Sequence, residues 1–193
     1  GGGWGGATGI NSSGQIVGFS NTADGATHAV AYDGASPRDL GDFGGSYSQA
    51  TGINNAGLIV GVSSTADGEP RAFLYDSTGL HDLGDGQANG INSAGQIVGS
   101  SDASGAFLYS NGAMVDLNTL IDPSLGWYLD SATAINDQGQ IVGFGHDAAN
   151  DQRAFLLSLS PQAVPEPSSL ALATIGCMAV AGFAARKHTA HAD

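Results

Sequence analysis

The nine residues INNAGLIVG at positions 53–61 are one of four closely similar copies in the chain. The other copies begin at Ile10, Ile91 and Ile135, so that successive copies are 43, 38 and 44 residues apart. An apolar segment of the form Ala-Phe-Leu-Tyr follows every copy, and an Asp-Leu pair follows the first three. Landmarks that share one period of about 40 residues predict a repeat architecture, in which each copy folds as one small unit.

The four residues after each isoleucine have the composition of a tight turn. Their first member is an asparagine, whose side chain can hydrogen-bond its own backbone two residues on, and their last is a glycine, which adopts a left-handed backbone without strain. The asparagines are Asn11, Asn54, Asn92 and Asn136, and the glycines are Gly14, Gly57, Gly95 and Gly139. We therefore predict four short antiparallel strands per repeat: one before this turn, one after it, the apolar segment, and the stretch that ends in Asp-Leu.

Four short strands in about 40 residues are typical of one propeller blade. Small residues ahead of the isoleucines fit an inner strand that is crowded around a central axis; they are Ala7, Gly9, Ala50, Gly52, Ala88 and Gly90. We predict an all-β, propeller-like domain of about four four-stranded blades over residues 1–160, with a β-solenoid or an open sandwich as alternatives. The fourth copy ends after its third strand, so one earlier strand, N-terminal to residue 1, would complete the last blade and close the ring.

The last part of the chain has the pattern of a membrane segment. Residues 168–185 carry no charge and, as a helix, would be about 27 Å long, close to the roughly 30 Å hydrocarbon core of a bilayer. Arg186 and Lys187 follow as a basic stop, which marks the cytoplasmic side. We predict a Pro-rich linker at 161–168, a transmembrane helix at 169–185 and a basic cytoplasmic tail at 186–193. A buried C-terminal helix of a soluble domain is the alternative.

The order of VPEPSS, an apolar helix and RKH resembles the PEP-CTERM sorting signal of bacterial exported proteins. This resemblance implies that an exosortase, a membrane-embedded cysteine protease, recognises and processes the tail. It also implies that Val164, Pro165, Glu166 and Pro167 form the recognised motif. Five residues follow the basic cluster, whereas such tails usually end soon after it. An exported protein needs an export signal, so we expect one before residue 1.

The repeats themselves carry a second resemblance. The pattern A-x-G-I-N-x-x-G-x-I-V-G, the A-F-L-Y segment and the D-L-G that follows resemble the HAF repeats of extracellular bacterial proteins over residues 1–158. This resemblance implies an extracellular domain and supplies no activity that could be transferred to particular residues.

Charge is distributed unevenly along the chain. Residues 1–160 contain three arginines and sixteen acidic residues, while the tail carries two basic residues, Arg186 and Lys187, and two acidic ones, so the net charge of −13 belongs to the repeats. Such a surface disfavours nucleic acid, whose binding proteins need clustered Lys and Arg. The single cysteine, Cys177, lies in the apolar tail and allows no disulfide within one chain.

The sequence shows no motif of a known catalytic site. His28, His81 and His146 occupy different offsets in their repeats, as solvated loop residues do, and the recurring Asp39, Asp82 and Asp116 are expected to hold turns. Loops at 21–25, 65–68 and 147–151 carry oxygen ligands that could hold Ca²⁺, although they lack the dense spacing of a true calcium loop. No other cofactor is expected.

Four aromatic residues, namely Trp4, Tyr47, Trp127 and Tyr128, stand in equivalent loops before the isoleucines. They could stack on sugar rings at one rim of the domain, or cover the ends of its core. We predict an exported, surface-displayed and non-enzymatic protein in adhesion or extracellular polysaccharide binding. The alternatives are a polysaccharide lyase or glycosidase on the same scaffold, which would need paired acidic or basic groups, and a purely structural envelope component.

Overall fold

The computed structural model describes residues 3–34 and 36–158, which form four small antiparallel β-sheets, one for each repeat. The first sheet holds β1 (Gly5–Ile10), β2 (Ile16–Asn21), β3 (Thr27–Tyr32) and β4 (Arg38–Asp39). The second holds β5 (Gly44–Ile53), β6 (Ile59–Thr65), β7 (Pro70–Asp76) and β8 (Gly79–Asp85). The third holds β9 (Gln87–Ile91), β10 (Ile97–Ser101), β11 (Gly105–Ser110) and β12 (Ala113–Asp116). The fourth holds β13 (Tyr128–Ile135), β14 (Gln140–His146) and β15 (Gln152–Ser158).

Neighbouring strands of a sheet are neighbours in sequence, so each sheet is a simple meander. One parallel pair, between Thr27 and Tyr47, links β3 to β5 and joins the first two sheets. The single-turn 3₁₀ helices η1 (Leu117–Leu120) and η2 (Pro123–Leu125) connect β12 to β13. Four strands are thus present in each of the first three repeats and three in the described part of the fourth, as the sequence predicts.

The turn between the first two strands of each repeat has the predicted construction. In the second repeat the Asn54 side-chain oxygen accepts hydrogen bonds from the backbone N–H groups of Ala56 and Leu58, both at 3.0 Å. Gly57 has a φ of 81°, in the left-handed region where a side chain would be strained. The same bonds recur at the three other asparagines, so one local motif sets the register of all four hairpins.

The isoleucine and valine after this turn point to opposite faces of their sheet, because side chains alternate along a strand. We call the face turned toward the preceding repeat the N-side face, and the one turned toward the following repeat the C-side face. Ile59 lies on the N-side face of the second sheet and packs with Val17 of the first. Val60 lies on the C-side face and packs with Ile97 of the third sheet. One Ile-Val pair therefore contributes to two interfaces.

The core of the protein consists of three hydrophobic clusters between successive sheets. Val17, Ala29, Ala31, Leu40, Ala50, Ile59 and Phe73 lie between the first and second repeats. Val60, Ala72, Ala88, Ile97 and Phe107 lie between the second and third. Val98, Ala106, Leu108, Leu117, Ile121, Leu129, Ala132, Ile141, Phe155 and Leu157 lie between the third and fourth. The phenylalanines belong to N-side faces, and a glycine stands opposite each on the adjacent strand; a Cβ on Gly61 would come within 2.7 Å of the Phe73 ring.

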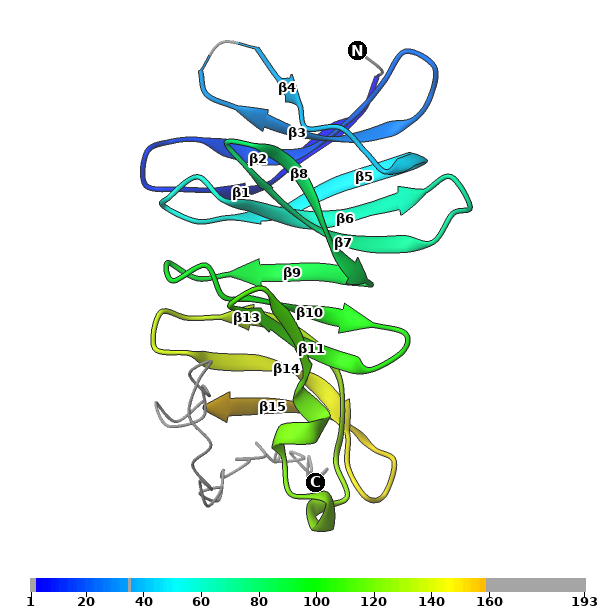
Figure 1. Ribbon diagram of the computed structural model, residues 1–193, viewed down its shortest axis with the longest axis vertical. Coiled ribbons are helices and arrows are strands. Elements are labelled where there is room, and N and C mark those ends of the chain that lie inside the picture. The colour runs from blue at the N-terminus through cyan, green and yellow to red at the C-terminus, as the bar shows by residue number, and fades with distance from the viewer. Residues whose placement is uncertain (1–2, 35, 159–193) are drawn as a thin grey trace, which may run out of the picture.

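The all-β repeat architecture is confirmed, but the prediction of a propeller is wrong. The sheets stack one above another along the long axis, and the first and last sheets lie at opposite ends of the molecule (Figure 1). The period of the sequence sets the size of one unit, whereas ring closure depends on the rotation between successive units, which no residue pattern here specifies. The small residues expected around a central axis instead let the first strands of successive repeats approach: a Cβ on Gly9 would lie 3.6 Å from the Gly52 Cα.

Several predictions on the end of the chain lie outside the described residues. These are the linker at 161–168, the transmembrane helix at 169–185 and the basic tail at 186–193. Within residues 3–34 and 36–158, no helix is both long enough and apolar enough to cross a membrane.

Candidate functional site

The first strand of each repeat contains a β-bulge at one fixed position. A bulge leaves one residue out of the ladder of paired residues and re-aims its side chain. The bulged residues stand two positions before the isoleucines, and they are Thr8, Thr51, Asn89 and Thr133. Because β1, β5, β9 and β13 follow one another along the stack, the four bulges place a column of polar side chains along the molecule.

The bulged side chains of the first three repeats connect each repeat to the next. The bonds run from Thr8 Oγ1 to the Ala50 carbonyl at 2.6 Å, from Thr51 Oγ1 to the Ala88 carbonyl at 2.7 Å, and from Asn89 Nδ2 to the Ala132 carbonyl at 2.8 Å. A second column of bonds follows the turns, from Asn11 Nδ2 to the Asn54 carbonyl, from Asn54 Nδ2 to the Asn92 carbonyl, and from Asn92 Nδ2 to the Asn136 carbonyl. These two hydrogen-bond columns hold the first strands of neighbouring repeats in a fixed relation.

An open groove of about 450 Å³ runs along the column of bulges and crosses all four repeats. Its lining residues are Thr8, Gln49, Thr51, Gln87, Asn89, Ser100, Ser131, Thr133 and Phe144. Eight of these nine residues are polar and uncharged, and the ninth, Phe144, is a partly exposed aromatic ring. We call this surface the polar groove.

Two glutamines in the polar groove keep unused hydrogen-bonding atoms. Gln49 Oε1 accepts a bond from the Tyr47 hydroxyl, and Gln87 Nε2 donates to Asn89 Oδ1 at 2.9 Å. Among the described residues, the Gln49 amide nitrogen and the Gln87 amide oxygen have no partner. The lining of the groove therefore includes one donor and one acceptor without a partner among the described residues, a combination that suits a ligand whose hydroxyl groups both donate and accept.

The predicted aromatic rim is only partly assembled. Trp4, Tyr47 and Tyr128 are exposed, while Trp127 is half-buried and packs against the cluster between the third and fourth repeats. The Trp4 ring lies 4.9 Å from the Phe19 ring in a tilted arrangement. Of the four, Tyr47 is joined to the polar groove, through its bond to Gln49.

The recurring aspartates have the structural role that the sequence predicts. Each side chain accepts a hydrogen bond from the backbone N–H two residues on, as in Asp39 to Gly41 at 2.8 Å, Asp82 to Gly84 at 2.9 Å and Asp116 to Asn118 at 2.8 Å. Burial opposes ionisation of Asp39, yet the hydrogen bonds from His28 and from the Gly41 N–H hold the pKa of this carboxyl below its ordinary value. These carboxylates stabilise turns and are not gathered into one site.

The three histidines are not the solvated loop residues that the sequence suggests. Each lies in a strand and contacts an aspartate: His28 contacts Asp39 and Asp42, His81 contacts Asp76, and His146 contacts Asp130. Hydrogen bonds from Thr78, and then from His81, lower the pKa of the Asp76 carboxyl well below its usual range. The sequence hides these pairs because the partners meet across neighbouring strands or around a turn.

The loops considered for Ca²⁺ are closed by their own hydrogen bonds. In the loop at 147–151, the Asp147 carboxylate accepts bonds from the Ala149 and Asp151 N–H groups and from Arg153. In the described part of the chain, no three His, Cys, Asp or Glu side chains lie together so that they could hold a metal ion. Calcium binding by these loops stays a prediction.

The chain also matches a known sorting signal. Comparison with protein-family models finds the PEP-CTERM protein-sorting motif at residues 163–187. This range contains Val164, Pro165, Glu166 and Pro167 and ends with Arg186 and Lys187, all outside the described residues. The chain carries a PEP-CTERM sorting signal. The motif supports an exported, cell-surface-associated protein that is sorted by an exosortase system.

The repeats have no such match. Neither the comparison with curated proteins nor that with solved structures finds a protein similar to this chain. The resemblance of residues 1–158 to HAF repeats gains no support from these comparisons and stays a prediction.

Sequence analysis did not identify the polar groove. Its signal was present, since a polar residue stands between two small residues at the same place in every repeat: Thr8, Thr51, Asn89 and Thr133. From the sequence, a role is predicted only for the small residues on either side, which are expected to pack around a central axis. The bulge that turns these side chains outward is a property of strand pairing, which a single strand does not reveal.

Proposed function

We propose that this protein is an exported, surface-displayed and non-enzymatic repeat protein whose polar groove binds a neutral extracellular polysaccharide. The observation that carries the proposal is the lining of the groove, which continues across four repeats with eight uncharged polar residues and one aromatic ring. Sugars present hydroxyl groups at their edges and C–H groups on their faces, and protein sites match them with amide and hydroxyl groups beside aromatic rings.

Charge supports a neutral ligand over an anionic one. The repeats carry the whole net charge of −13, which repels nucleic acid and acidic polysaccharides alike. No charged residue is among those that line the polar groove in the described part of the chain. A binding role needs no acid or base there, whereas a glycosidase needs a pair of carboxyl groups. The lining therefore favours binding over the lyase or glycosidase alternative.

The groove is tested by affinity electrophoresis of the full chain in gels that contain neutral polysaccharides, with an acidic polysaccharide as comparison. The double variant Gln49→Ala, Gln87→Ala removes two side chains that line the groove. We expect binding to a neutral polymer to weaken about tenfold, since each hydrogen bond contributes about 0.5–1.5 kcal/mol. Gln152→Ala, an exposed glutamine on β15 outside the groove lining, is the matched control and should bind as the native chain does.

If none of the neutral polymers slows the migration of the protein, the proposal is contradicted and a structural envelope component is favoured. Release of sugar fragments from a retained polymer would instead favour an enzyme.

The tail supplies the sorting part of the proposal. An exosortase-type membrane protease would recognise Val164, Pro165, Glu166 and Pro167, and the segment at 169–185 would hold the chain in the membrane, with Arg186 and Lys187 on the cytoplasmic side. The support is the matched motif together with the uncharged length of residues 168–185. Residues 161–193, fused to an exported reporter, should be processed only in cells that contain such a protease. Replacing Glu166 by Ala should reduce the processed fraction, whereas processing in cells that lack the protease would contradict this part.

A further inference from the structure

The two ends of the stack expose several apolar positions that are covered in the other repeats. On the C-side face, Val17, Val60 and Val98 of the first three repeats are 0% exposed, but Val142 of the fourth repeat is 42% exposed. On the N-side face, the alanines of the later repeats, Ala50, Ala88 and Ala132, are fully buried, whereas Ala7 of the first repeat is exposed. Ile10 of the first repeat is 67% exposed, whereas its counterparts Ile53, Ile91 and Ile135 are half-buried. Val30, on the same face as Ala7, remains buried at 7% exposure. Within residues 3–34 and 36–158, each end of the stack therefore presents an apolar sheet face with no sheet against it.

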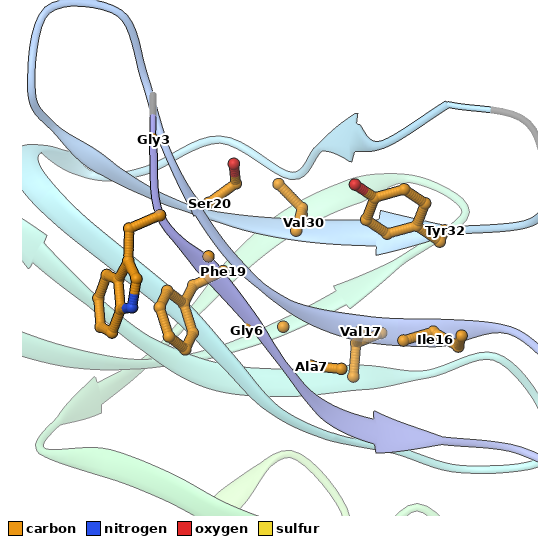
Figure 2. Close-up of a pocket in the computed structure, with 12 residues that line it drawn as sticks. Gly3, Gly6, Ala7, Ile16, Val17, Phe19, Ser20, Val30 and Tyr32 are labelled. Atoms are coloured by element: carbon orange, nitrogen blue, oxygen red, sulfur yellow. The ribbon is translucent and has the colours of Figure 1, made fainter. Parts of the chain in front are cut away.

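The open face of the first sheet is hollowed. Ala7, Ile16, Gly18, Val30 and Tyr32 line a pocket of about 420 Å³ there. Figure 2 shows the side chains of Ala7, Ile16, Val30 and Tyr32, which come from β1, β2 and β3. None of the twelve residues that line the pocket is charged. Val30 contributes to the hollow because it stands where the later repeats have Phe73, Phe107 and Phe155. Because none of the lining residues is charged, burial of this face would leave no charge without a partner.

The interior of the molecule shows which surface fits such a face. At all three internal interfaces, the N-side face of one sheet packs on the C-side face of the preceding sheet. The open C-side face of the fourth sheet includes Val142, Ala154 and Leu156, at the positions that Val60, Ala72 and Leu74 occupy in the second repeat. The two open faces of one chain are thus the two halves of an interface that the chain already forms three times.

The hydrogen-bond columns also stop at the fourth repeat. Asn136 Nδ2 has the position from which Asn92 Nδ2 bonds the next repeat, but among the described residues it bonds only to the side chains of Gln138 and Gln140. Thr133 Oγ1 bonds within its own sheet, to the Val142 carbonyl at 3.2 Å. The corresponding acceptors at the other end of the molecule are the carbonyl groups of Ala7 and Asn11. Both columns would continue from the fourth repeat of one copy into the first repeat of another.

We propose that copies of this chain associate head to tail, with the C-side face of the fourth sheet of one copy packed on the N-side face of the first sheet of the next. The contact is heterologous, because it joins two different surfaces of the same protein, and it therefore produces either an open chain of molecules or a closed ring. The partner is a second copy because both halves of the interface belong to this chain. The polar groove would continue from copy to copy, since the bulged residues form one of the two columns.

The experiment measures the molar mass of the full chain by sedimentation velocity over a range of protein concentrations. A mild detergent keeps the apolar tail soluble, and high ionic strength screens the repulsion between copies of net charge −13. We expect the mass of the native chain to rise with concentration in steps of one chain.

Two variants each place a charge on one open face: Ala7→Lys at the N-terminal end and Val142→Lys at the C-terminal end. Both positions are exposed, so the fold should be retained, and circular dichroism checks this. Each variant alone should stay monomeric. An equimolar mixture of the two should form a species of two chains, because each variant keeps the face that the other lacks.

The double variant Ala7→Lys, Val142→Lys retains the tail and controls for association through it. It should stay monomeric alone and in mixtures. A native chain that remains monomeric at all concentrations would overturn the proposal. Association that persists in the double variant, or a mixture of the single variants that forms no larger species, would overturn it as well.

Discussion

Among the residues that the structure describes, the second and third repeats are covered by a neighbour on both faces, whereas the first and fourth each leave one face bare. The same local motif builds all four, since each has its own asparagine turn, its bulge and its Ile-Val pair. Yet Val60 of the second repeat is 0% exposed and Val142 of the fourth is 42% exposed, at equivalent positions. Burial in this molecule is therefore set by the neighbouring repeat and not by the sequence of the repeat itself.

This difference in burial between interior and terminal repeats indicates how stability is distributed along the stack. In a stack where each unit contacts only the units beside it, stability is approximately the sum of the intrinsic stability of each repeat and the free energy of each interface. An interior repeat contributes to two interfaces and a terminal repeat to one. Substitutions on covered faces should accordingly cost more than substitutions on bare faces, and the predictions below test this expectation in pairs.

The largest effect is expected for Phe107→Ala. Phe107 is fully buried in the cluster between the second and third repeats, and its removal should lower the free energy of unfolding by about 3–5 kcal/mol, through lost burial and a residual cavity. Phe144→Ala, on the open side of the fourth repeat, should cost less than about 1 kcal/mol. Urea unfolding followed by circular dichroism measures both. Equal losses would show that the stack does not divide into covered and bare faces.

The turn asparagines give the next largest difference. Asn54→Ala removes two local bonds and also the bond from Asn54 Nδ2 to the Asn92 carbonyl, in a side chain that is buried. Asn136→Ala removes bonds within its own exposed turn only. A buried group left without its partner costs about 1–3 kcal/mol. We therefore expect Asn54→Ala to destabilise the protein by about 1–2 kcal/mol more than Asn136→Ala, as measured by the same unfolding experiment.

These pairs also show what the sequence could and could not predict. The turn at Asn54 and Gly57 is a local structure, so the residues that form it are close in sequence and their chemistry suffices. The strands on either side follow from the same register, and the apolar segment at 72–75 has the composition of a strand that is covered on both faces. The all-β class and the number of strands per repeat were therefore predictable.

Ring closure was not predictable, because it depends on how one sheet is rotated on the next. The residues that set this geometry, such as Gly9 against Gly52, were identified as small, but small residues permit close approach in an open stack as well as around an axis. The polar groove was missed for a related reason. Thr8 and its equivalents leave the ladder only because their strand pairs with a partner that lacks one residue there.

A smaller effect is expected along the column of bulges. Thr51→Val removes a hydroxyl that is half-buried and bonds the carbonyl groups of Val60 and Ala88. Thr133→Val removes an exposed hydroxyl with a single bond, to Val142 in its own sheet. We expect a loss of about 1 kcal/mol for Thr51→Val and almost none for Thr133→Val, since a typical hydrogen bond contributes about 0.5–1.5 kcal/mol. Thermal unfolding of the two variants beside the native protein distinguishes the outcomes, and an equal loss would argue against a stabilising bond between repeats.

The smallest effect concerns acid sensitivity and separates two of the interfaces. The Ser12 N–H donates to Asn55 Oδ1 at 3.0 Å between the first and second repeats, and the Ser93 N–H donates to Asp137 Oδ1 at 2.8 Å between the third and fourth. The bonds from the backbone and the side chain of Ser93 lower the pKa of Asp137 below its ordinary value of 3.8. Because this pKa is lower in the folded protein than in the unfolded chain, ionised Asp137 stabilises the fold above pH 3.8, and this contribution is lost as the pH falls through the lowered value.

The variant Asp137→Asn places at the last interface the residue type that the first interface already has. Its amide oxygen can still accept the bond from Ser93, but it does not titrate. We expect the urea midpoint to fall less between about pH 6 and about pH 3 in this variant than in the native protein, because one group with a lowered pKa has been removed while the other carboxylates still titrate. Asp67→Asn, in an exposed loop, controls for the loss of one negative charge and should keep the native response. If both variants respond to acid as the native protein does, the contact at Asp137 does not stabilise the last interface, and the difference between the two interfaces lies in their apolar clusters alone.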